Sequence, residues 1–312
     1  MFSGGLDSMV AVRTIQNAGV KVEAITFKSP FFNSKNAEKS AKQLGIKLKV
    51  VHLGNDYLKM IKKPCHGHGK NLNPCIDCKI FMLKKAKQHA KKIRADFIFT
   101  GEVLGQRPMS QNLQALNMIE KNSGLKGKLL RPLSAKLLPE TVYEKKGVVD
   151  RNNLLSIQGR ERKEQMALAE KFRIKEYPSP AGGCLLTEGD FCRKLSDYFR
   201  HNKKISMKDI EMLKTGRHFR FKKTKIVTGR NKEENEKLLK LKSRGDILMQ
   251  ALDVKGPVTI VKKPYSRASI EKAAMITARY SDSKDETARI KYGKKTVEAA
   301  KAKDEEIEKL RI

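Results

Sequence analysis

The sequence predicts an α/β protein in two parts, an open parallel sheet with helices on both faces followed by a small α+β domain. Its 312 residues suggest two domains. In the first part, short apolar strands alternate with amphipathic helices, which is typical of a parallel sheet. From residue 217 on, short strands are punctuated by glycine and proline. We therefore expect domains at 1–188 and 215–312, joined by a helical linker over 189–214.

The elements of the first part can be read in chain order. We expect a helix over 9–19, a strand over 22–27, a helix over 36–45, a strand over 46–53, a helix over 77–93, a strand over 95–102 and a helix over 159–172. Glycines at positions 19 and 45 close the first two helices. The segment 178–184 is rich in turn residues and ends this pattern.

The second part has a different sequence pattern. We expect strands within 217–229 and 246–263, with helices over 233–241, 268–281 and 296–312. The last of these is a charged segment, and its expected role is to pack on the small domain.

Composition and charge exclude several classes of protein. No apolar run of about 18 residues occurs, so no transmembrane helix is expected. The opening residues, MFSGGLDSMV, lack the features of a secretory signal, which makes the cytoplasm the expected location. The net charge of +33 is carried by both halves and attracts polyanions such as nucleic acid. The alternative is a uniformly lysine-rich surface without a specific partner.

A glycine-rich loop lies at the start of the chain and leads directly into a helix. It consists of Ser3, Gly4, Gly5, Leu6, Asp7 and Ser8. The glycines allow an anion to approach the backbone, and the helix N-terminus offers free N–H groups. Asp7 would repel a phosphate unless Mg²⁺ lies between them, so the loop indicates a metal–nucleotide site.

The run SGGLDS resembles the signature of the PP-loop ATP pyrophosphatases, an adenine nucleotide alpha hydrolase-like family. The resemblance implies that ATP is split into AMP and pyrophosphate, with Asp7 in a catalytic role. Thr26 and Phe27, at the end of the strand 22–27, complete the expected nucleotide site. The family has a full strand before the loop, whereas only Met1 and Phe2 precede it here. Either the given sequence begins after most of this strand, or the strand is nearly absent.

A second motif follows the strand 95–102. The residues from Thr100 to Gln106, with Ser110 and Gln111, resemble the TGE-x-LGQ-x-x-SQ run of the tRNA 4-thiouridine synthases. Gly101 allows close backbone approach, and Glu102 and Gln106 can orient a nucleotide or Mg²⁺. One extra residue, Pro108 or Met109, interrupts the pattern. The competing interpretation is a polar turn.

Five cysteines in a chain expected in the cytoplasm argue against a disulfide framework. Cys75 and Cys78 begin a helix whose N-terminus favours thiolates, and Cys184 follows two glycines that leave it accessible. Cys65 and Cys192 are expected to fill space as small apolar side chains.

Three uses of the cysteines stay open. The spacing resembles that of thiolation enzymes in which three cysteines, here Cys75, Cys78 and Cys184, hold a [4Fe–4S] cluster. In the cluster-free relatives, Cys78 and Cys184 would instead match a persulfide carrier and its resolving partner. A structural zinc would use Cys75 and Cys78 with Cys65, His66 or His68.

Residues 217–283 resemble the NFACT RNA-binding domain, through Gly229-Arg230-Asn231 and the later Gly256-Pro257. Together the resemblances imply an ATP-dependent tRNA thiolation enzyme, which takes sulfur from sulfide or from a cysteine desulfurase persulfide. Arg160 and Arg162 are expected to face phosphates or RNA, or else solvent. A ligase or sulfur transferase for a small molecule and a non-catalytic RNA-binding protein are the alternatives. The sequence predicts no membrane partner and no particular oligomeric state.

Overall fold

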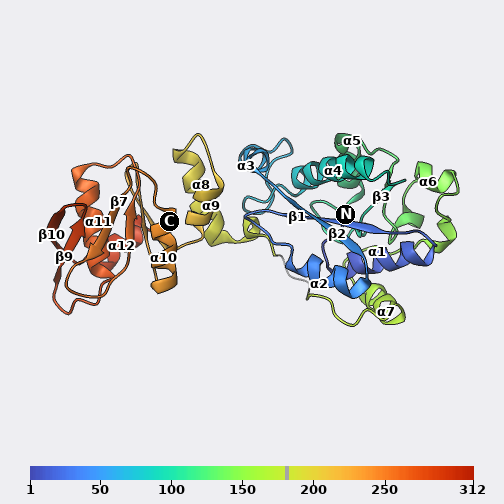
Figure 1. Ribbon diagram of the computed structural model, residues 1–312. Coiled ribbons are helices and arrows are strands. Elements are labelled where there is room, and N and C mark those ends of the chain that lie inside the picture. Colours follow the sequence, from blue (N-terminus) through green and yellow to red (C-terminus); the bar gives the residue numbers. More distant parts are fainter. Residues whose placement is uncertain (180–182) are drawn as a thin grey trace. The chain divides into compact units, whose positions relative to one another are not determined.

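The computed structural model describes residues 1–179 and 183–312. It divides into two compact units, Met1–Thr187 and Glu188–Ile312 (Figure 1). The helices α8 (Gly189–His201) and α9 (Met207–Leu213), in the segment expected to link the domains, fall within the second unit. In the part of the chain that the structure describes, no helix is long and apolar enough to cross a membrane.

The first unit contains two small parallel sheets. Strand β1 (Glu23–Lys28) pairs with β2 (Lys47–His52), and β3 (Ile98–Phe99) pairs with β4 (Leu129–Leu130). The first two residues bridge them: the Phe2 N–H donates to the Ile25 oxygen at 2.8 Å, and the Met1 amino group donates to the Phe99 oxygen at 2.7 Å. The fold is α/β as predicted, but its two parallel sheets have two strands each and are smaller than the open sheet we expected.

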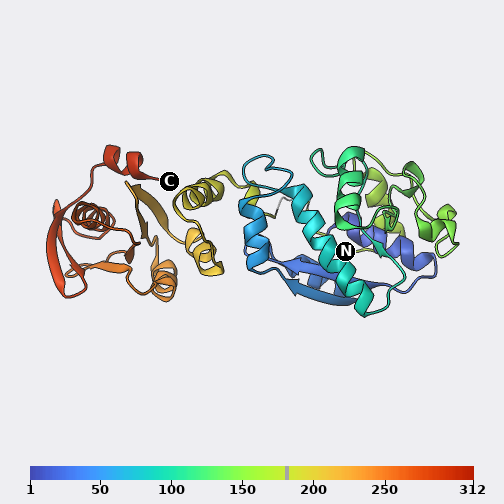
Figure 2. The ribbon, with the colours of Figure 1, turned by 90° about the horizontal axis from the view of Figure 1, so that it is seen from above.

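Helices pack on both sides of these strands, α4 and α5 on one side and α1, α2 and α7 on the other (Figure 1). Figure 2 shows α4 lying over β1 and β2. The helices and 3-10 turns of this unit are α1 (Leu6–Asn17), α2 (Lys35–Leu44), α3 (Asn55–Lys62), α4 (Cys75–Lys92), α5 (Leu113–Ser123), η1 (Ala135–Leu137), α6 (Val142–Lys145), η2 (Arg151–Asn153), α7 (Lys163–Lys171) and η3 (Leu185–Thr187). One core joins α1, α2 and α7, and another joins α4, α5 and β4.

The second unit is built on a six-stranded antiparallel sheet with the order β10-β9-β7-β8-β6-β5. Its remaining elements are β5 (Arg217–Phe221), β6 (Thr224–Thr228), α10 (Lys232–Leu241), β7 (Ile247–Ala251), β8 (Thr259–Val261), α11 (Arg267–Arg279), β9 (Thr287–Tyr292), β10 (Lys295–Ala300) and α12 (Asp304–Leu310). The buried residues of α11 pack against the sheet and α12 to form its main core.

The prediction of one helix over 296–312 was wrong. Residues Lys295–Ala300 form β10, and only Asp304–Leu310 are helical. The chain turns at Gly293, with φ +58, and pairs β10 antiparallel with β9. This pairing places Ala299 in the core, and it outweighs the helical tendency of a run rich in alanine and lysine.

Candidate functional site

The loop before α1 is held against the start of α2. Gly4 has φ +77, and a Cβ atom there would lie 2.4 Å from the carbonyl carbon of Asn36, so only glycine fits. The Ser40 hydroxyl donates to the Gly4 oxygen at 2.9 Å, and the Ser8 hydroxyl donates to the Gly5 oxygen at 2.8 Å. The loop therefore has a fixed shape, and it leaves the N-terminal N–H groups of α1 directed at the space where an anion would bind.

Asp7 lies in the first turn of α1 with an unsatisfied carboxylate. Its Oδ1 atom is buried and has no hydrogen-bond partner within residues 1–179 and 183–312. Burial raises the pKa of Asp7 above its usual value, although Gln106, Arg162, Arg107 and Gln165 lie near enough to lower it. A cation bound beside this carboxylate would favour its charged form. The structure thus brings Asp7 and Gln106 together, and it adds Arg107 and Gln165, which the sequence analysis missed.

The second motif packs directly on the first. A Cβ atom on Gly101 would lie 2.6 Å from the Ser8 Cα, so a side chain there would push the two loops apart. Thr26 and Phe27 are buried in β1, just beyond the Ile25 carbonyl that accepts the Phe2 N–H. Their contact with a nucleotide stays a prediction.

Glu102 is part of a buried ion-pair network and is not available to orient a nucleotide, which corrects that expectation. Its carboxylate accepts from Lys79 of α4 at 2.6 Å and from the Arg131 Nε at 3.0 Å, and Thr100 also donates to it. Burial alone would raise the pKa of Glu102, but the two cations outweigh it and lower the pKa to about 2. The network fastens the second motif to α4 and to the end of β4.

We expect Glu102→Gln to lower the free energy of unfolding by about 3 kcal/mol at pH 7, because Lys79 and Arg131 would lose their buried counter-charge. The folded-state pKa lies below the ordinary value of 4.5, so this stabilisation is complete above about pH 4.5 and is lost as the pH falls toward 2. Urea titrations across this range should therefore show the two proteins converging at low pH. Glu161→Gln, at an exposed position, is the control. A constant gap between wild type and Glu102→Gln would contradict the network's role.

Cys75 and Cys78 occupy the first turn of α4, as predicted. The Cys78 sulfur lies 3.0 Å from the hydroxyl of Tyr57, a fully buried residue of α3 that no sequence signal marks. Burial raises the pKa of Cys78 to about 12; the Tyr57 hydrogen bond opposes this shift, and charge on Cys184 and Cys75 adds to it. At Cys78, burial therefore opposes the thiolate form that the helix N-terminus would favour.

The segment after Cys184 docks beside the other two cysteines. The Leu185 N–H donates to the Phe31 oxygen at 3.0 Å, and Leu72, three residues before Cys75, donates to the Leu186 oxygen at 3.3 Å. Of the turn-rich segment expected over 178–184, Pro180, Ala181 and Gly182 lie outside the described residues. The fold thus gathers Cys75, Cys78 and Cys184 around Tyr57 from distant parts of the sequence.

This arrangement does not fit a metal centre. Among the residues described, no three His, Cys, Asp or Glu side chains are grouped so that they could hold a metal ion. The predicted [4Fe–4S] ligands are neighbours but are not assembled as ligands. The zinc alternative fails in the same way, because His66 pairs with Asp77 at 3.0 Å and His68 bonds to the Ile61 oxygen at 2.8 Å.

The remaining two cysteines differ from each other. Cys192 is buried in α8, as expected of a space-filling side chain. Cys65 is exposed, so the same expectation was wrong for it.

The extra residue in the second motif lies over the cysteine loop. A Cβ atom on Gly69 would lie 1.9 Å from the Met109 sulfur, so the Met109 side chain rests directly on the Gly69 backbone. Gly69 in turn donates to the Asn73 oxygen at 3.0 Å, two residues before Cys75. The interruption in the motif therefore joins the Gln106 loop to the loop that leads into the cysteines.

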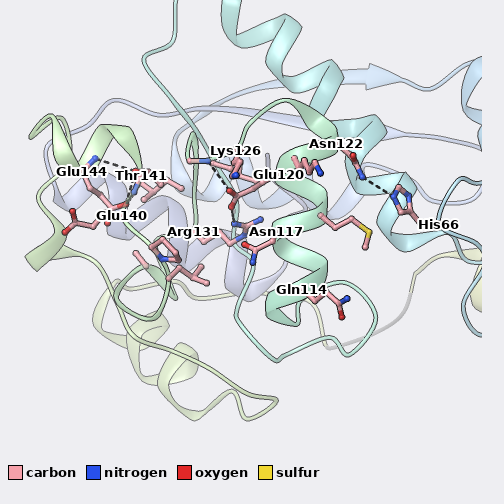
Figure 3. Close-up of a pocket in the computed structure, with 18 residues that line it drawn as sticks. His66, Gln114, Asn117, Glu120, Asn122, Lys126, Arg131, Glu140, Thr141 and Glu144 are labelled. Atoms are coloured by element: carbon pink, nitrogen blue, oxygen red, sulfur yellow. Dashed lines mark hydrogen bonds and ion pairs between the residues drawn. The ribbon is translucent and has the colours of Figure 1, made fainter.

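A cavity of about 930 Å³ lies beside α5 (Figure 3). Gln114 and Asn117 of α5 line one side, and Glu140 and Thr141 lie across from them. Arg131 lines it too and pairs there with Glu120. The cavity thus shares Arg131 with the Glu102 network.

Three arginines in or next to β5 and β6 have partners within the second unit. Arg220 binds the Asp197 carboxylate of α8, with its Nε at 2.9 Å, and the buried Lys225 binds the same carboxylate at 3.0 Å. Arg217 lies over the Tyr280 ring at 4.4 Å, and Arg230 pairs with Glu234. By contrast, Lys222 and Lys223 are exposed at the turn between β5 and β6.

The protein belongs to a class of two-domain proteins. An α/β domain with a glycine-rich loop before its first helix is joined to a small domain with an antiparallel sheet and exposed lysines. Comparison with known families gives each unit its identity. Residues 1–137 match the family model "Thiamine biosynthesis protein (ThiI)", and residues 216–311 match "NFACT protein RNA binding domain". Each unit is thus similar to a different family, and neither family model spans half of the chain. ATP use is expected of the PP-loop family.

Similar proteins carry names that agree with the ThiI match. A probable tRNA sulfurtransferase of Finegoldia magna is 33% identical over 144 residues, which are 43% of this chain and 35% of that protein. One from Macrococcus caseolyticus is 37% identical over 142 residues, 43% of this chain and 33% of that protein. The tRNA-specific 2-thiouridylase MnmA of Sulfurimonas denitrificans is 33% identical over 112 residues, a third of each chain. The chain thus spans about a third of the length of these curated relatives.

One solved structure, the C-terminal part of the fibronectin/fibrinogen-binding protein of Streptococcus suis, covers 76% of this chain and 94% of its own. Its sequence identity is 14% and its TM-score is 0.29.

Proposed function

We propose that this protein is a tRNA sulfurtransferase that adenylates a uridine carbonyl oxygen with ATP and then replaces that oxygen by sulfur. The observation that carries the proposal is the packing of the two motifs on each other, with Gly101 against Ser8 and Gln106 near Asp7. The names of the relatives that match the ThiI domain support the reaction. The NFACT match and the net charge of +33 support tRNA as the partner.

In the first step, the α1 N-terminus and the loop before it bind the phosphates of ATP. The uridine oxygen attacks the α-phosphorus, and pyrophosphate leaves with the bonding electron pair. Mg²⁺ would neutralise charge on the leaving pyrophosphate. Asp7 would hold this ion, because its carboxylate lies in the first turn of α1, directly after the anion loop. Arg162 and Arg107, which lie near Asp7, supply further positive charge for the phosphates.

In the second step, sulfur enters from the cysteines that surround Tyr57. The terminal sulfur of a persulfide on Cys78 or Cys184 attacks the adenylated carbon, and AMP leaves. The other cysteine then attacks the sulfur still attached to the protein, which forms a disulfide and releases the thiouridine. A thiol reductant returns the pair to the reduced state, and the persulfide of a cysteine desulfurase then transfers its outer sulfur to the thiol, which renews the persulfide on this protein. No step uses a metal cluster.

Nucleoside mass spectrometry of tRNA from cells with and without the gene tests the proposal. A thiouridine that disappears with the gene supports it and shows whether the product is 4-thiouridine or a 2-thiouridine. Unchanged thiouridine, together with no pyrophosphate release from ATP and tRNA in vitro, would overturn it in favour of RNA binding without catalysis. Pyrophosphate release that does not depend on RNA would favour a small-molecule substrate.

Phosphate contacts in the second unit should come from its exposed lysines. Replacing Lys222 and Lys223 together by glutamine should lower the slope magnitude of log affinity for tRNA against log salt by about 1.4–1.8, which corresponds to two lost contacts. Salt titrations of the intact chain measure this slope. Arg230→Gln is the matched control, because its charge is already balanced by Glu234. An unchanged slope in the double variant would move RNA capture to other basic residues.

A further inference from the structure

Gln165 of α7 is a fully buried glutamine whose side chain has no hydrogen-bond partner. Neither its Nε2 nor its Oε1 atom is satisfied within residues 1–179 and 183–312, and the residue is 0% exposed. A buried amide without partners destabilises a fold, and an apolar side chain of the same size would pack there at no such cost. We therefore ask whether the Gln165 amide gains a hydrogen-bond partner when the protein binds a ligand.

The surroundings of Gln165 point to the anion loop. Helix α7 packs against α1, whose first turn carries Asp7. Arg162 is the N-cap of α7, three residues before Gln165, and both residues are near Asp7. The Asp7 Oδ1 atom is likewise buried and without a partner. An unsatisfied donor and an unsatisfied acceptor are thus neighbours at the proposed nucleotide site.

We propose that Gln165 is a positioning residue for Asp7, whose amide donates to Oδ1 when a nucleotide–metal complex is bound and so fixes the carboxylate for the metal. This inference rests on the proposed function. A small shift of Asp7 toward α7 would satisfy both buried atoms at once, and the other carboxylate oxygen would then face the ion.

The test replaces Gln165 by methionine, which has a similar volume and no hydrogen-bonding group. Calorimetry should show that the full-length variant binds Mg²⁺-ATP about tenfold more weakly than the wild type, the scale of one lost hydrogen bond to a charged group. Binding of ATP in the presence of EDTA should not change. The melting temperature should stay the same or rise, because a buried unsatisfied amide has been removed. Gln165→Leu provides a second apolar variant if the methionine variant folds poorly.

Glu164→Met is the control, since it makes the same replacement at the exposed neighbouring position. If the wild type itself does not bind ATP, the proposed function fails, and Gln165 is not the cause. If the wild type binds Mg²⁺-ATP and the Gln165 variants bind it equally well, the positioning role is overturned. An equal loss with and without Mg²⁺ would also overturn it, because that result indicates a general distortion of the loop.

Discussion

Replacing Asp7 by asparagine should lower the rate of pyrophosphate release about a thousandfold, the scale of losing one preorganised charge at a reacting centre. The substitution keeps the shape of the side chain and removes the negative charge that would hold the metal. Asp7 belongs to the first turn of α1, whose loop is fixed by Gly4 and Ser40, so the fold should survive. Affinity for tRNA should stay within a few-fold, because the residue serves the nucleotide.

Pyrophosphate release with tRNA present, together with a tRNA binding curve, measures both effects. Asp56→Asn is the matched control, since Asp56 is exposed on α3 and has only a distant lysine partner. Full activity in the Asp7 variant would contradict the assignment of the anion loop. A loss of tRNA binding of the same size would instead place Asp7 on the RNA surface.

Replacing Cys78 or Cys184 by serine should abolish thiouridine formation and leave pyrophosphate release intact. The physical reason is that the two steps use different groups: the first needs the anion loop, and the second needs a sulfur carrier and a resolving thiol. Thiouridine is measured by nucleoside mass spectrometry and pyrophosphate by a coupled assay, on the same samples. Cys192→Ser should behave like the wild type, because that cysteine fills space in α8 of the second unit.

Replacing Cys75 distinguishes the persulfide scheme from the scheme with a [4Fe–4S] cluster. With a persulfide pair, Cys75→Ser should retain activity, and protein purified without air should be colourless. A brown protein that is bleached by replacement of any of the three cysteines would show that the thiols rearrange into a [4Fe–4S] site. That result would overturn the persulfide scheme. The grouping in the structure favours the colourless outcome.

Local sequence signals were sufficient to predict the positions of the motifs and of most helices. SGGLDS predicted a loop that opens a helix, because two glycines and a following amphipathic run have few other conformations. Gly45 closes α2 in the left-handed conformation, as its position after the apolar face predicted. These features depend on neighbours in the chain, and the sequence contains them.

Charge patterns were a weaker guide. The excess of positive charge suggested contacts with nucleic acid, yet Arg220 and Lys225 neutralise Asp197 of α8. Charges along the sequence do not reveal which of them find a buried counter-charge. The lysines left exposed at the turn could be recognised only once that pairing was known.

By itself, the sequence determined the division of the chain, the anion loop and the residue types available for nucleotide and sulfur chemistry. The tertiary structure decided which of them meet. It placed Gln165 beside Asp7, Tyr57 on Cys78, Met109 over Gly69, and Glu102 between two cations. It also turned Lys295–Ala300 into a strand. Each of these outcomes depends on contacts between residues far apart in the chain, and on burial that shifts a pKa or leaves a polar atom unsatisfied; neither is a property of a local segment.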